Sequence, residues 1–77
     1  MRTLADLQEG EFATIKRYND HSVACKLMEM GCLPNHHLAV LRKAVLGNLI
    51  YVQAGRCSFA IRHNQAQTIV VSAKNQE

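Results

Sequence analysis

Histidine and cysteine side chains recur at spacings that could hold a metal ion. His21 and Cys25 lie four residues apart, so a helix through this segment would place both side chains on one face. Cys32 lies close in sequence to His36 and His37. Thiolate and imidazole ligands suit zinc, but a structural zinc site usually has four ligands in closely spaced pairs, which this sequence lacks. We therefore expect no resident cofactor and regard any transition metal on these residues as adventitious.

The same His21 and Cys25 could act as base and nucleophile. Nucleophilic catalysis also needs a group that orients the base, usually at the edge of a cleft. No acidic residue obviously orients His21, and a chain of 77 residues offers little room for a cleft. The sequence also has no glycine-rich loop followed by Lys-Ser or Lys-Thr, the pattern that binds nucleotide phosphates. We therefore expect a protein that is not an enzyme.

These side chains need a helix to position them, and residues 21–30 have the clearest helical pattern in the chain. Asp20 is a natural N-cap, and Gly31 stands where a helix commonly ends in the left-handed conformation. The pattern predicts three core residues on one face, which are Val23, Leu27 and Met30. Met28 lies off this stripe, so we expect it to be exposed.

The rest of the chain predicts short strands separated by turns. We expect strands at residues 12–18, 38–44, 49–54, 57–62 and 68–72. Residues 3–6 read as a single helical turn, Gly47-Asn48 and Gly55-Arg56 as tight turns, residues 63–66 as a short turn, and residues 73–77 as a frayed tail. Alternation predicts that Ala13, Ile15, Phe59 and Ile61 face inward. The pattern indicates a mainly β domain, a small antiparallel barrel of about five strands with one inserted helix.

Charge and cysteine content narrow the class of protein. Nine Lys and Arg against six Asp and Glu give a net charge of +3, and the basic residues are dispersed. Nucleic-acid-binding surfaces are usually denser and carry aromatic residues, which make up only 5% of this chain. Three cysteines, no secretion signal and no apolar stretch long enough to span a bilayer indicate a cytosolic location. We expect one domain over residues 1–77.

Several segments, in register, resemble the FeoA family. Residues 26–35, K-L-M-E-M-G-C-L-P-N, are similar to its R-L-x-E-L-G-L-x-P-G signature. Leu4-x-x-Leu7-x-x-Gly10 resembles the family's first turn, residues 44–49 resemble its A-P-L-G-D-P hairpin, and residues 61–71 resemble its closing L-R…A…I-x-V pattern. Here Lys26 and Asn35 replace the usual Arg and Gly, and Val45 and Leu49 replace both hairpin prolines. The resemblance implies an SH3-like domain, which also forms the C-terminal module of iron-dependent repressors.

The resemblance also implies a function by protein–protein interaction. FeoA-type proteins are expected to act on the cytosolic region of FeoB, the GTPase-transporter of bacterial ferrous iron uptake. The implied contact residues are those of the helix exit and the hairpin, namely Met28, Glu29, Leu33, Leu46, Gly47, Asn48 and Leu49. Two alternatives stay open: a zinc or iron sensor or chaperone, and a small nucleic-acid-binding barrel. A peptide-binding SH3 module is disfavoured because proline-rich ligands dock on aromatic grooves, and the chain has four aromatic residues.

Overall fold

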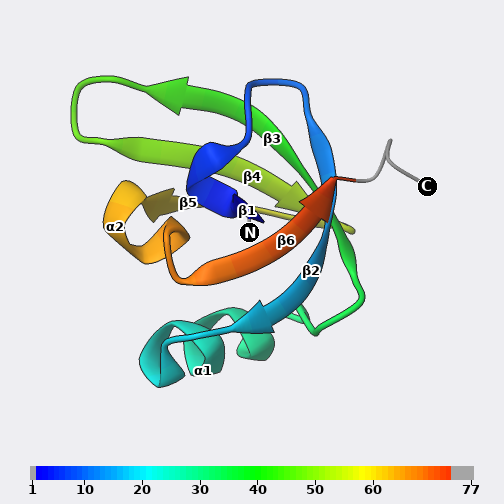
Figure 1. Cartoon of the computed structure of the whole chain (residues 1–77). Helices are drawn as coiled ribbons and strands as arrows, with labels where there is room; N and C mark the ends of the chain where they lie inside the picture. Colours follow the sequence, from blue (N-terminus) through cyan, green and yellow to red (C-terminus); the bar gives the residue numbers. More distant parts are fainter. Residues whose placement is uncertain (1, 74–77) are drawn as a thin grey trace.

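A computed structural model describes residues 2–73, which form one curled antiparallel sheet with short helices beside it (Figure 1). The elements in chain order are β1 (Arg2–Thr3), the 3-10 turn η1 (Leu4–Asp6), β2 (Phe12–Tyr18), α1 (His21–Glu29), β3 (His37–Ala44), β4 (Leu49–Ala54), β5 (Cys57–Arg62), α2 (His63–Ala66) and β6 (Ile69–Ala73). The strand order is β1-β6-β2-β3-β4-β5. The mainly β prediction with one inserted helix between the first long strands is therefore confirmed.

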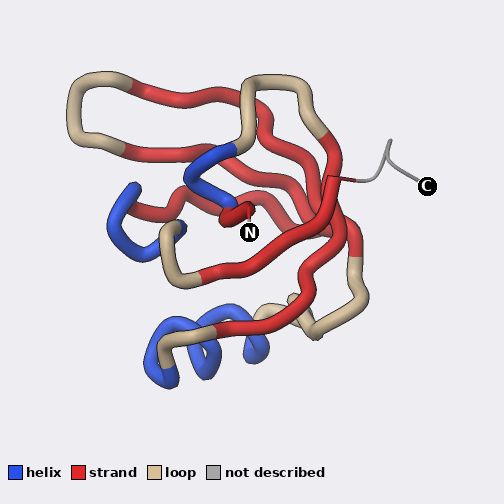
Figure 2. Tube along the Cα trace, viewed as in Figure 1, coloured by secondary structure: helices blue, strands red, loops and turns tan. Residues whose placement is uncertain are grey.

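Two β-bulges help the sheet to curl around its core. One interrupts the β2–β6 register between Ile15 and Arg17, and the other interrupts the β3–β4 register between Val40 and Arg42. A bulge bends its strand and increases the local twist. The trace in Figure 2 shows the long strands wrapping around one side of the molecule, with α1 below them. The largest fully buried side chains are Leu4, Leu7, Ile15, Ile50, Ile69, Val40, Val52 and Cys32.

The α1 helix begins where the sequence predicts and ends one residue earlier, at Glu29, and its core face is different. Asp20 caps the helix by accepting a hydrogen bond from the Val23 N–H at 3.0 Å. Val23, Ala24 and Leu27 are buried. The prediction that Met30 belongs to the core is wrong, because the helix ends at Glu29 and Met30 is 36% exposed.

The chain turn after α1 explains this difference. Gly31 has a φ of +88°, the left-handed conformation predicted for it. The reversal brings Cys32 beneath the helix, where its N–H donates to the Leu27 carbonyl at 3.0 Å. Cys32 is buried and belongs to the same hydrophobic core as Leu27, whereas Met30 does not.

Smaller differences concern the ends of the chain. The predicted turn at residues 63–66 is the short helix α2, the last strand begins at Ile69, and β1 adds a sixth strand by pairing with Val70 and Val71. The predicted helical turn near the start is confirmed as η1, where the Asp6 carboxylate accepts from the Thr3 N–H at 3.0 Å. Residues 74–77 of the predicted tail lie outside the described residues. No helix within residues 2–73 is long and apolar enough to cross a membrane.

Candidate protein-interaction site

The most exposed apolar side chains lie at the tip of the β3–β4 hairpin. Val45 is 92% exposed and Leu46 is 90% exposed. The turn is completed by Gly47 and Asn48, which both adopt positive φ, at +83° and +54°. The Asn48 carbonyl accepts a hydrogen bond from the His63 N–H at 2.9 Å, which joins the tip to α2. The tip therefore presents two adjacent apolar side chains from a supported loop that projects from the body of the sheet (Figure 1).

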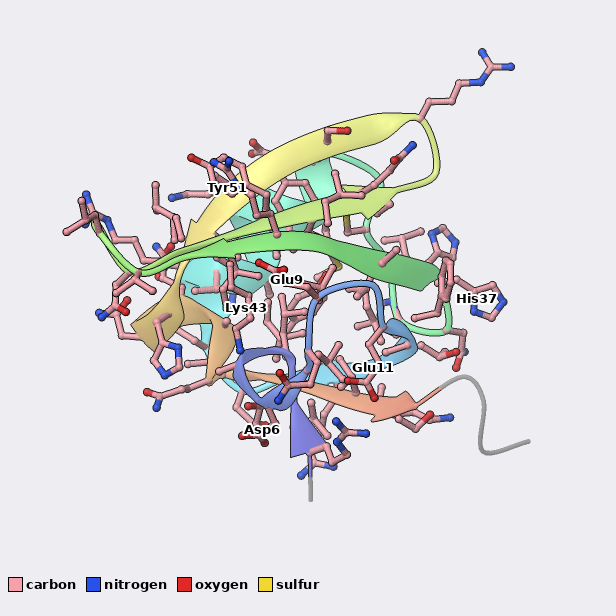
Figure 3. The ribbon with its side chains drawn as sticks, turned by 90° about the horizontal axis from the view of Figure 1, so that it is seen from above. Asp6, Glu9, Glu11, His37, Lys43 and Tyr51 are labelled. Atoms are coloured by element: carbon pink, nitrogen blue, oxygen red, sulfur yellow. The ribbon has the colours of Figure 1, made fainter. Side chains whose placement is uncertain are left out.

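Lys43 ties the base of this hairpin to the N-terminal segment. Its ammonium group donates to the carbonyls of Ala5 and Leu7, at 3.1 Å and 2.9 Å. Its backbone N–H donates to the Glu9 carboxylate at 2.8 Å. Figure 3 shows Lys43 pointing toward η1. Because both ends of the loop are held, the apolar tip loses little conformational entropy when a partner covers it.

Two more carboxylates complete the charged region around Lys43. Glu11 accepts from the Gln8 N–H at 2.8 Å and forms an ion pair with Arg2 at 3.1 Å, and both contacts lower the pKa of Glu11. The hydrogen bond from the Thr3 N–H lowers the pKa of Asp6. We call the group of Arg2, Asp6, Glu9, Glu11 and Lys43 the anchored face.

The helix exit forms a second exposed apolar region. Met28 is 39% exposed and Leu33 is 43% exposed, and Glu29 between them is also exposed. The Tyr18 hydroxyl donates to the Cys32 carbonyl at 2.5 Å and so fixes the exit loop to β2. Burial of the phenol raises the pKa of Tyr18 to about 12, so it stays protonated and remains a donor at neutral pH.

The partner-binding residues predicted from the sequence therefore fall into two exposed groups. Met28, Glu29 and Leu33 lie at the helix exit, while Leu46, Gly47 and Asn48 lie at the hairpin tip. Leu49 differs from the others, since it is half-buried as the first residue of β4.

Only one pair of the metal-ligand candidates comes together. The Cys25 thiol lies 3.4 Å from His21 Nε2 on the exposed face of α1. Cys32 is buried, and burial, with the neighbouring Cys57, raises the pKa of its thiol. Among residues 2–73, no three or more His, Cys, Asp or Glu side chains are grouped so that they could hold a metal ion.

The two remaining candidates have partners of their own. His36 Nδ1 lies 2.9 Å from the Gly31 carbonyl, and His37 Nδ1 lies 3.0 Å from the Thr14 hydroxyl. Both contacts hold strand and loop segments together. Each histidine thus has a contact within the fold, and no hydrogen bond among residues 2–73 joins either of them to the Cys32 thiol.

Sequence reasoning missed several surface residues. Val45 was not among the predicted contacts, although its replacement of a family proline marked it as unusual. Phe12 and Leu41 are exposed on strands, and Arg42 stacks over the Tyr51 ring at 4.9 Å. Phe12 and Leu41 each neighbour an inward-facing residue, Ala13 and Val40, so alternation places them outward, whereas Arg42 is exposed because a bulge lies between Val40 and Arg42.

The curled sheet, the inserted helix and the exposed hairpin define a small SH3-like domain with apolar surface available for contact. The family model described as the FeoA domain matches residues 2–73, so this chain belongs to the FeoA family. The resemblance read from the sequence is therefore confirmed. No curated protein sequence matched the chain.

Solved structures agree with this assignment. The FeoA protein from Chlorobium tepidum has 30% sequence identity and a TM-score of 0.88, with 95% of this chain and 70% of that chain covered. The FeoA of Stenotrophomonas maltophilia, solved with zinc, has 28% identity and a TM-score of 0.81, with 94% and 91% covered. That protein is described as an SH3 domain protein and a candidate activating factor of bacterial ferrous iron transport.

The fold also occurs within a larger regulator. A manganese-dependent transcriptional repressor matches with a TM-score of 0.85 and 21% identity, covering 94% of this chain and 36% of that chain. At this identity the likeness concerns the fold alone.

Proposed function

We propose that this chain is an accessory protein of ferrous iron uptake, and that it acts in the cytoplasm by binding the cytosolic region of an FeoB-type transporter. Membership of the FeoA family supports the iron-uptake context. The observation that supports binding is the exposure of Val45 and Leu46, at 92% and 90%, on a hairpin held at both ends. Two exposed apolar residues suit a small, transient interface.

The helix exit is the second contact region of this proposal. Met28 and Leu33 extend the apolar surface, and Glu29 adds a charge between them. Neither region is needed to fill the core, so a substitution there tests contact without removing packing. The domain would regulate the transporter by contact and would catalyse no reaction itself.

Complementation of iron uptake tests the proposal. A strain that lacks the endogenous protein is given the wild-type chain, Leu46→Asp or Met28→Asp, and uptake of labelled ferrous iron is measured. Both substitutions should leave the circular dichroism spectrum unchanged, because the side chains are exposed, and both should abolish the stimulation of uptake. Gln67→Asp adds the same charge at an exposed position on neither surface and should restore full uptake.

Direct binding separates the possible failures. Titration of the purified transporter's soluble region should show affinity for the wild-type chain and for Gln67→Asp, and lost affinity for Leu46→Asp. Full uptake with both Leu46→Asp and Met28→Asp would remove the two surfaces from consideration. Normal uptake without the gene would overturn the function itself.

A further inference from the structure

Strand β5 is an edge of the sheet, and the outward main-chain groups of Ser58 and Ala60 have no partner among residues 2–73. Among the strands of residues 2–73, its only neighbour in the sheet is β4. The two-residue turn at Gly55 and Arg56 makes Ala54 and Cys57 a hydrogen-bonded pair, and the register then runs without a bulge to Leu49 and Arg62. Hydrogen-bonded and non-hydrogen-bonded pairs alternate along an antiparallel ladder. The N–H and C=O groups of Ser58 and Ala60 therefore point away from β4.

The N–H and C=O groups of Ser58 and Ala60 are evenly spaced along the edge, so another strand could pair with them. Within residues 2–73, no hydrogen bond is made by the main chain of Ser58 or Ala60 on this side. Both residues are exposed and carry small side chains, which do not block approach. The Arg62 N–H differs, because it donates to the Gln65 side chain at 3.3 Å and so closes one end of the edge. An unpaired edge of this kind can accept another extended chain.

Helix α1 faces this edge across an apolar groove. Leu27 and Met30 line the groove from the helix, and Phe59 and Ala60 line it from β5, leaving a cavity of about 60 Å³. Phe59 is only partly buried and Met30 is 36% exposed, so the groove has an open apolar mouth. We call this feature the β5 groove. Its volume suits one short aliphatic side chain.

Lys26 is the charged side chain among the residues that line the groove. Four carboxylates elsewhere in the fold, those of Asp6, Glu9, Glu11 and Asp20, accept hydrogen bonds from main-chain N–H groups. Three cations lie at the groove or near the two ends of β5, namely Lys26, Arg56 and Arg62. None of them has a carboxylate partner among residues 2–73. An occupant with negative charge would be attracted to both ends of the edge.

We propose that the β5 edge binds an extended, acidic segment of a partner protein. The segment adds an antiparallel strand beside β5, pairs with the main chain of Ser58 and Ala60, and places one aliphatic side chain in the β5 groove. Alternating main-chain donors and acceptors require a polypeptide as the occupant, and the three cations select for acidic side chains. This goes beyond the proposed function, because it does not depend on the hairpin tip or on an iron transporter.

The pairing makes a prediction about which peptide residues matter. Residues opposite Ser58 and Ala60 would have their side chains on the exposed face and their N–H groups directed at β5. Residues opposite Phe59 would direct their side chains into the groove and their N–H groups away from β5. The probe is therefore a capped peptide of alternating glutamate and valine, about seven residues long, enough to pair along an average strand.

NMR titration of the isotope-labelled chain provides the test. The peptide should shift the amide signals of Ser58 and Ala60 and slow their hydrogen exchange, with a Kd of about 0.1 mM. N-methylation of the glutamates should abolish binding, because those N–H groups donate to β5. N-methylation of the valines is the matched control and should leave the affinity unchanged. A lysine and valine peptide should not bind.

Protein variants give an independent reading. Ala60→Pro removes one outward N–H and should lower affinity at least tenfold, whereas Ala60→Thr keeps it and should bind as wild type. Lys26→Gln should weaken binding about twofold to fivefold at low salt, while Lys16→Gln, away from the groove, should not. Leu46→Asp should bind the peptide normally, which separates this surface from the hairpin.

Three results would overturn the proposal. These are no shift at Ser58 and Ala60 at about 1 mM peptide, equal binding of the glutamate-methylated peptide, or shifts confined to another surface. Because the methylated peptides are tested on the wild-type chain, the conclusion does not depend on whether Ala60→Pro folds.

Discussion

The anchored face and the β5 groove use charge in opposite ways. On the anchored face the ammonium of Lys43 bonds two carbonyls, and Glu11 bonds both a main-chain N–H and Arg2. At the β5 groove, Lys26 and Arg62 have no carboxylate partner among the described residues, and the edge of β5 is unpaired. Four carboxylates of the fold, those of Asp6, Glu9, Glu11 and Asp20, therefore bond to its own main chain, whereas the cations near the β5 groove have no carboxylate partner among residues 2–73.

The strongest test of this comparison removes the packing beneath the groove. Leu27 is 4% exposed and holds α1 against the sheet, so Leu27→Ala should lower the free energy of unfolding by about 2–4 kcal/mol. Leu33→Ala, at an exposed position beyond the helix, should change it by less than about 0.5 kcal/mol. Urea denaturation measures both. Equal midpoints for Leu27→Ala and the wild type would mean that the helix does not depend on this contact.

A smaller effect is expected from removing the ammonium on the anchored face. Lys43→Met keeps the aliphatic stem but leaves the carbonyls of Ala5 and Leu7 without their donor, which should cost about 1–2 kcal/mol. Arg62→Met removes a cation with no carboxylate partner among residues 2–73 and should stay within about 0.5 kcal/mol of the wild type. If Lys43→Met and Arg62→Met had equal free energies of unfolding, the hydrogen bonds of Lys43 would contribute no more to stability than the cation of Arg62.

The smallest effect is the pH dependence that Glu11 on the anchored face contributes. The folded pKa of Glu11 is held below its ordinary 4.5 by the Gln8 N–H and by Arg2. A lowered folded pKa contributes stability that is present above 4.5 and is lost as the pH falls through the folded value. Thermal unfolding measured from neutral to acidic pH should therefore show a falling midpoint, and Glu11→Gln should flatten that fall.

A control on the other side of the molecule makes this test specific. Glu29→Gln removes a carboxylate that accepts no hydrogen bond from the described residues, and its profile should match that of the wild type. A Glu11→Gln profile that also matched the wild type would show that the ion pair with Arg2 contributes nothing to acid sensitivity.

Local chemistry in the sequence was sufficient to predict most elements. Asp20 and Gly31 mark the ends of α1 because a cap and a left-handed residue act over one turn of chain. The error at Met30 arose because the helical period was continued one residue past the helix, although Gly31 already marked the reversal. Helix α2 was missed because four residues carry too little periodicity to separate a helix from a turn.

Of the candidate site, only the hairpin tip could be predicted, because it depends on the Gly47-Asn48 turn. The exposed tip follows from Gly47-Asn48, which forces the chain to reverse and leaves Leu46 outside the sheet. The anchoring of Lys43 could not be predicted, since its acceptors lie more than thirty residues away. The free edge of β5 could not be predicted either. Which strand lies at the edge depends on where β6 pairs, and β6 inserts between β1 and β2.

Strand β6 also sets when this domain can fold during its synthesis. It lies between β1 and β2 in the sheet, yet it is the last strand of the described chain. Residue 2 pairs with residue 71, so a growing chain has β2 to β5 available while β1 has no neighbour and β2 lacks one of its two. Pairing over such a sequence distance is slow relative to local hairpins. The domain therefore completes its sheet only after residue 73 has left the ribosome, and until then its newly made edges are open to other chains.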